Sequence, residues 1–165
     1  MNMKLFIRSA LFIMTINVCP LTYAVNYDYK EVKDFPPLSS FKSVKEFENN
    51  YEKYIQDCLD NTYYGTGGIP CLISQDMWDR ELNIYYKQLY AKLNSKDQQT
   101  LKQSQMAWLK FRDNNNEFIS LLVGKKYTEQ GSMYLLRRAG EENSMITPIV
   151  KQRALELKIL AKLLK

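Results

Sequence analysis

Histidine is absent from this chain of 165 residues, and cysteine occurs only three times. Without histidine there is no Ser-His-Asp or Cys-His nucleophile system, and the usual metal ligand is missing. Two thiolates alone do not fill a zinc shell. No glycine-rich loop stands between a strand and a helix, so the Gly-Thr-Gly-Gly run at residues 65–68 is not a nucleotide motif. These absences predict a protein with no metal and no cofactor.

Carboxylates leave one enzymatic alternative open. Asp76 and Asp79 lie three residues apart, and Glu81 follows closely. A glycosidase uses two such groups as acid and base, but it needs a cleft in which one pKa is raised. Acids on a helix surface are usually just solvated. We therefore predict no catalytic residue and no enzymatic activity.

The first 24 residues have the pattern of a secretory signal peptide. Lys4 and Arg8 are followed by an apolar run at residues 11–18, and small residues precede a cleavage point after Ala24. The apolar run is too short for a comfortable membrane span. We predict an exported, periplasmic protein in which residues 1–24 are removed.

Residues 25–165 would then form a single domain, which begins with an extended lead-in at residues 25–42. A lipid anchor on Cys19 is a weaker alternative, because the Ile-Asn-Val before it is a poor lipobox. Cleavage after residue 24 leaves only Cys58 and Cys71. Two cysteines in an exported chain usually pair, and redox motifs have a tighter spacing. We predict a disulfide that closes the loop between them.

Charge is distributed unevenly along the chain. Residues 46–81 hold eight acidic and two basic residues, a net charge of −6. Residues 82–165 hold fifteen basic and seven acidic residues, a net charge of +8. An acidic half that packs against a basic half explains this pattern, and an acidic face that attracts a cationic partner is compatible with it. The exported destination argues against nucleic acid as a partner.

Apolar residues recur at helical spacing along most of the mature chain. Ser43 and Glu46 form a capping-box pattern, and Ser95 and Gln98 form another. Thr147 and Pro148 are typical of an N-cap and a first helical position. The predicted helical segments are residues 44–60, 74–93, 95–124, 133–138 and 147–165. The second and third should form a long antiparallel hairpin, so we predict an all-α fold, a small helical bundle with a disulfide-stapled loop.

Two motifs lie on the predicted hairpin, one at residues 78–86 and one at residues 103–113. Their key residues are Trp78, Leu82, Asn83, Gln105, Trp108, Phe111 and Arg112. We interpret the aromatic and aliphatic members, together with Tyr85, as core. Asn83 and Gln105 are expected to pair across the hairpin, and Arg112 to meet Asp79 or Asp113.

These motifs resemble the LprI-like lysozyme-inhibitor family. The resemblance runs from about Cys58 to Arg153 and also includes Leu101 and the Gly131-Ser132 pair. It implies an exported helical domain with disulfides that inhibits lysozyme-type enzymes. Family members commonly carry two further cysteines, one after Phe-Arg-Asp and one after Gly-Ser. This chain has neither, so the resemblance implies one disulfide fewer and a looser region at residues 124–144.

The loop between the cysteines is the predicted partner-binding edge, although an ordinary glycine-rich helix connection is an open alternative. Inhibitors commonly push a rigid loop into an enzyme's groove, and tyrosines supply contact area with a polar tip. The predicted binding residues are Asp60, Tyr63, Tyr64, Thr66, Gly67, Gly68 and Ile69.

Two function hypotheses follow. The first is a periplasmic inhibitor of a cationic peptidoglycan hydrolase of the lysozyme or amidase class, or an immunity protein against an antibacterial effector such as those of type VI secretion. The alternative is a non-catalytic structural or assembly factor of the envelope.

Overall fold

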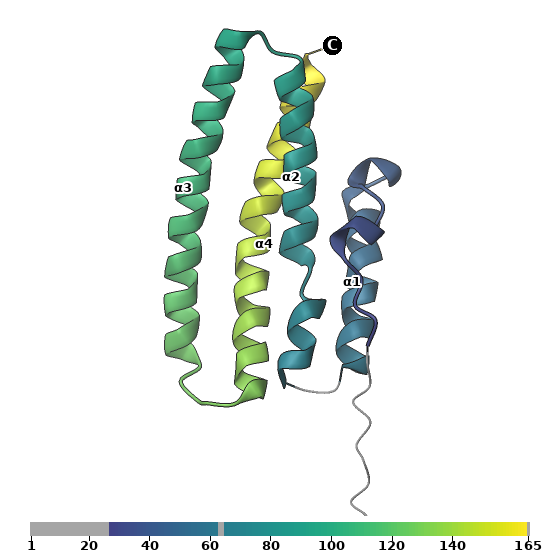
Figure 1. Ribbon diagram of the computed structural model, residues 1–165, viewed down its shortest axis with the longest axis vertical. Helices are drawn as coiled ribbons and strands as arrows, with labels where there is room; N and C mark the ends of the chain where they lie inside the picture. Colours follow the sequence, from purple (N-terminus) through teal and green to yellow (C-terminus); the bar gives the residue numbers. More distant parts are fainter. Residues whose placement is uncertain (1–26, 63–64, 165) are drawn as a thin grey trace, which may run out of the picture.

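The computed structural model describes residues 27–62 and 65–164 as an all-helical bundle (Figure 1). Its α-helices are α1 (Val44–Asn61), α2 (Ser74–Ala91), α3 (Ser95–Lys126) and α4 (Ser132–Leu163). Three 3-10 helices accompany them: η1 (Val32–Asp34), η2 (Leu38–Ser40) and η3 (Gly65–Cys71). The all-α prediction is confirmed, and α2 and α3 form the long antiparallel hairpin (Figure 1). The predicted signal peptide lies outside the described residues.

The helix starts follow from local capping. The Ser43 hydroxyl oxygen accepts a 3.1 Å hydrogen bond from the Glu46 N–H, so the first predicted cap is confirmed. At the start of α3 the cap is Asn94, whose side-chain oxygen accepts from the Asp97 N–H at 3.0 Å, and not the predicted Ser95. Asn94 takes this role because it ends the tight turn from α2 in an extended conformation.

The core is centred on aromatic side chains of α1 and α2. Trp78 is fully buried, and its indole lies edge-on to Phe47 with ring centroids 5.2 Å apart. The indole N–H donates to the Tyr51 hydroxyl at 3.0 Å, so this polar group is satisfied in the interior. Leu82 and Tyr85 are also buried, as predicted. This cluster attaches α1 to the rest of the bundle.

Helix α4 is continuous, which corrects the predicted break at residues 139–146 and the predicted start at Thr147 and Pro148. Pro148 lies inside the helix, and the Thr147 hydroxyl donates back to the Asn143 carbonyl at 2.6 Å instead of capping. Buried Ile146 and Val150 flank the proline and continue one apolar stripe against the bundle. Packing along this stripe outweighs the loss of one backbone hydrogen bond.

Helix α3 contributes little to the core, with only Leu101, Gln105 and Val123 buried. Phe111 is 54% exposed, which corrects its placement in the core, and Trp108 is only half-buried. In Figure 1, α3 stands to one side of the bundle, and no other described element covers its outer face. Helix α3 therefore exposes apolar side chains that the helical periodicity predicted to be buried.

The predicted Asn83–Gln105 pair does not form. Asn83 is exposed and donates to the Asp79 carbonyl one turn earlier, at 2.8 Å. The Gln105 side-chain oxygen instead accepts from Arg153 of α4 at 3.1 Å. The prediction for Arg112 is confirmed, because its guanidinium contacts Asp113 at 2.7 Å and approaches Asp79 at 3.8 Å.

Side-chain hydrogen bonds tie the turn between α3 and α4. The Glu141 carboxylate accepts from Lys126 at 2.6 Å and from the Tyr127 hydroxyl at 2.5 Å. Both bonds lower the pKa of Glu141, and the bond from Lys126 has the larger effect. Arg138 adds a 2.7 Å bond to the Tyr127 carbonyl. The region that was expected to be loose is helical on both sides of a turn held by these bonds.

Arg80 holds the N-terminal lead-in against the bundle. Its guanidinium donates to the carbonyls of Val32, Phe35 and Pro36 at 2.7–3.0 Å and pairs with the carboxylate of fully buried Glu81 at 2.8 Å. The lead-in thus contains the two single turns η1 and η2 rather than a wholly extended chain. None of the helices described is long and apolar enough to cross a membrane.

We expect Arg80→Ala to lower the free energy of unfolding by about 3 kcal/mol, because it leaves the buried Glu81 carboxylate without its partner. Chemical denaturation of the exported chain measures this loss. Lys33→Ala, which breaks the exposed Lys33–Glu31 pair, is the control and should leave the midpoint almost unchanged. Equal midpoints for the Arg80 variant and the native chain would contradict the assigned role.

Candidate partner-binding surface

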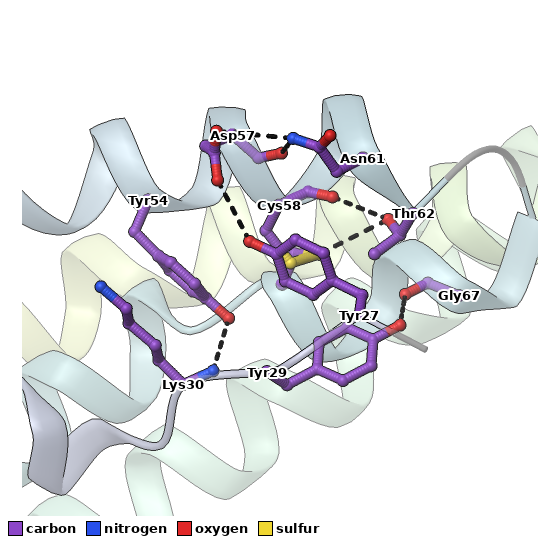
Figure 2. Close-up of a disulfide and its surroundings, with 10 residues drawn as sticks. Tyr27, Tyr29, Lys30, Tyr54, Asp57, Cys58, Asn61, Thr62 and Gly67 are labelled. Carbon is purple, nitrogen blue, oxygen red and sulfur yellow. Dashed lines mark hydrogen bonds between the residues drawn. A yellow bond between two sulfur atoms is a disulfide. The ribbon is translucent and has the colours of Figure 1, made fainter. Parts of the chain in front are cut away.

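A disulfide joins the end of α1 to the end of η3 (Figure 2). Cys58 and Cys71 are both fully buried, with their Cα atoms 5.7 Å apart. The Thr62 hydroxyl donates to the Cys58 carbonyl at 2.9 Å and closes the last turn of α1 over the bond. The predicted disulfide is confirmed.

Two glycines seat η3 on α4. Gly65 has a φ of +77°, which favours glycine, and a Cβ placed there would lie 2.5 Å from the Ser132 hydroxyl oxygen. Gly68 is buried, and a Cβ there would lie 3.0 Å from Leu59 and 3.1 Å from Leu136. The loop therefore packs closely against the first turns of α4 and is fixed as part of the fold.

The lead-in covers the other side of the loop (Figure 2). The Tyr29 hydroxyl donates to the Gly67 carbonyl at 2.7 Å, and the Tyr27 hydroxyl donates to the Asp57 carboxylate at 3.2 Å. Burial raises the pKa of Tyr27, and the hydrogen bond to Asp57 raises it further. The loop is thus bonded to the lead-in as well as to α1.

The structure separates the predicted binding residues into three groups. Asp60 and Thr66 are exposed and Ile69 is 36% exposed; these three form the surface that we call the loop edge. Gly67 is half-buried, and Gly68 is buried in its contact with α4. Tyr63 and Tyr64 lie outside the described residues, so their role stays a prediction.

The three carboxylates of the enzymatic alternative have different environments. Glu81 is fully buried in its pair with Arg80. Asp79 accepts from the Asn83 amide at 3.0 Å. Asp76 is exposed in the first turn of α2, and its pKa is raised by partial burial and by the charge of Asp79. Of the three, Asp79 lines the groove between α2 and α3, whose lining includes neither Asp76 nor Glu81.

A second surface lies between α2 and α3. A groove of about 350 Å³ is lined by Asp79, Leu82, Asn83, Tyr86, Lys102, Gln105, Met106, Leu109 and Arg112. Four of these are key motif residues: the sequence assigned Leu82 to the core and expected Asn83, Gln105 and Arg112 to form polar pairs. Met106 is 60% exposed, and the Arg112 guanidinium lies 5.5 Å from the Trp108 ring. Asn83 and Arg112 are polar members of the motifs. Their polarity is the feature of the sequence that could have indicated a solvent-facing groove here.

The family model of the lysozyme inhibitor LprI matches residues 71–157. The chain belongs to the LprI lysozyme-inhibitor family. Membership implies a lysozyme inhibitor with a protein partner such as lysozyme, and it is consistent with an exported protein that is not an enzyme. No curated protein and no solved structure is significantly similar to this chain. In this LprI-family protein the matched segment contains the α2–α3 groove, whereas the loop edge precedes it.

We expect Gly65→Ala to lower the free energy of unfolding by at least about 2 kcal/mol, because alanine is strained at this φ and its methyl group would collide with Ser132. Thermal or chemical denaturation measures the change. Gly124→Ala, at a helical position with open space around it, is the matched control and should stabilise by about 0.5–1 kcal/mol. Similar effects of the two substitutions would contradict the docking of η3 on α4.

Proposed function

We propose that this protein acts in the periplasm and inhibits a peptidoglycan hydrolase of the lysozyme class by presenting the loop edge to the enzyme. Family membership supports inhibition, and the fixed loop supports the choice of surface. The observation that carries the proposal is the disulfide-linked η3, whose exposed Thr66 and Ile69 lie on a segment anchored by buried cysteines and glycines.

Rigidity is the physical reason for choosing the loop edge. A flexible loop loses conformational entropy when it binds, and that loss subtracts from affinity. Here the disulfide, the contact of Gly68 with Leu136 and the bond from Tyr29 to the Gly67 carbonyl have already ordered the backbone. Ile69 offers apolar contact, and Thr66 offers a hydroxyl at the same edge.

Charge supports a cationic target. Helix α1 has five acidic and two basic residues, and Glu52, Asp57 and Asp60 are exposed along it. A negative surface beside the loop edge accelerates encounter with a positively charged enzyme, and added salt weakens this effect. A cationic lysozyme, or an amidase of the same charge, fits this surface.

The partner enzyme decides between two biological roles. A general inhibitor would act on lysozymes that reach the periplasm from outside. A dedicated immunity protein would act on one effector delivered by a neighbouring cell, for example through type VI secretion. Inhibition of a broad lysozyme panel supports the first role, and inhibition of a single effector hydrolase supports the second.

The test compares two triple alanine variants of the exported chain against cationic lysozymes and amidases. Asp60→Ala, Thr66→Ala and Ile69→Ala together remove the loop edge. Because a binding hot spot contributes about 2 kcal/mol or more, we expect the inhibition constant to rise at least about 30-fold. Peptidoglycan hydrolysis followed by turbidity gives the constant, and calorimetry gives the affinity.

The matched control removes the same kinds of side chain elsewhere. Glu117→Ala, Thr100→Ala and Ile159→Ala change exposed residues of α3 and α4 and should leave inhibition unchanged. A third variant, Met106→Asp, places a charge in the α2–α3 groove. Loss of inhibition in this variant alone would move the binding site to the groove. Absence of inhibition by the native chain would favour an envelope-assembly role.

A further inference from the structure

The end of the bundle away from the disulfide is built from two chain segments. The turn from α2 to α3 lies beside the C-terminus of α4 (Figure 1). Lys92 fixes this arrangement, because its ammonium group donates to the carbonyls of Ala161 and Leu164 at 2.7 and 2.6 Å. Helix α2 separates this end from η3. We call residues 87–102 and 158–164 the basic tip.

Positive charge is concentrated in the basic tip. Its charged residues are Lys87, Lys92, Lys96, Lys102, Lys158, Lys162 and Asp97, a net charge of +5. Four of these lysines (87, 96, 102 and 162) are exposed and form no ion pair with any residue that the structure describes. Burial lowers the pKa of Lys158, and the positive charge of Lys162 lowers it further.

Apolar side chains are exposed among these lysines. Ile159 is 62% exposed and Leu163 is 71% exposed, and Tyr90 and Leu164 are each 38% exposed. Exposed aliphatic and tyrosine side chains among unpaired lysines are the combination that binds the interface of an anionic bilayer. At such an interface, lysine side chains contact lipid phosphates and aliphatic side chains enter the acyl boundary.

We propose that the basic tip binds the surface of an anionic lipid bilayer peripherally. Charge favours this occupant over a second copy of the chain, because two tips of net charge +5 repel each other. The proposal goes beyond inhibition, since it places the protein in the envelope. Helix α4 has 32 residues and is about 48 Å long, with η3 on its first turns and the tip at its last, so a membrane-bound tip would hold η3 well away from the lipid.

Vesicle co-sedimentation tests the proposal directly. The exported chain is mixed with vesicles of phosphatidylglycerol and phosphatidylcholine, or of phosphatidylcholine alone. We expect binding to the anionic vesicles only, and its weakening as salt is raised from 50 to 300 mM. The double variant Lys96→Glu and Lys162→Glu should lower the partition coefficient by at least about 25-fold, because each lysine at such a surface contributes roughly fivefold.

Two further variants separate the tip from net charge and from self-association. Lys45→Glu and Lys53→Glu, on α1, make the same change of charge away from the tip and should retain most of the binding. Leu163→Ser with Ile159→Ser should weaken binding while the circular dichroism spectrum stays native.

The proposal would be overturned if the α1 and tip variants lost vesicle binding equally. It would also be overturned if the native chain bound neutral and anionic vesicles equally. Sedimentation of the chain as a dimer that Leu163→Ser abolishes, without any binding to vesicles, would overturn it as well. Inhibition of lysozyme is measured separately, so failure of the lipid proposal leaves the inhibitor proposal intact.

Discussion

The bond between Cys58 and Cys71 is the constraint on which the rest of the structure depends. It links the end of α1 to the segment that leads into α2, and closing a loop of this length contributes roughly 3 kcal/mol through the unfolded state. With both ends held, η3 has one place to lie, between the lead-in and the first turns of α4. Buried Gly65 and Gly68 allow the close approach, and the aromatic packing of Trp78 aligns α1 with the bundle.

The two ends of the molecule have opposite chemistry. One end carries the disulfide, the fixed loop edge and the acidic α1. The other carries unpaired lysines and exposed aliphatic side chains. Long helices separate the two ends and keep both surfaces available at the same time. Under the two proposals, the basic tip would bind anionic lipid while the loop edge faces a cationic hydrolase. The groove between α2 and α3 lies along the side and remains open to solvent.

Sequence patterns predicted the elements whose signals are local. Helices α1 and α2 were predicted because their aromatic and aliphatic residues recur at helical spacing, and the disulfide because the predicted signal cleavage would leave two cysteines. Apart from the cap of α3, which is Asn94 and not Ser95, the errors were mostly long-range. Pro148 stays within α4 because packing on both sides favours a continuous helix. Phe111 is exposed because none of the described elements covers that face of α3, and Gln105 binds Arg153 of a helix distant in sequence. Periodicity identifies an apolar face but not whether a partner covers it.

The most direct test of the binding surface is amide hydrogen exchange of the exported chain with and without a lysozyme that it inhibits. If the loop edge binds the enzyme, amide exchange slows across residues 57–71 in the complex and does not change in residues 87–102 or 158–164. Protection confined to the parts of α2 and α3 that line the groove, with residues 57–71 unchanged, would contradict it and place the inhibitory surface on the helix hairpin.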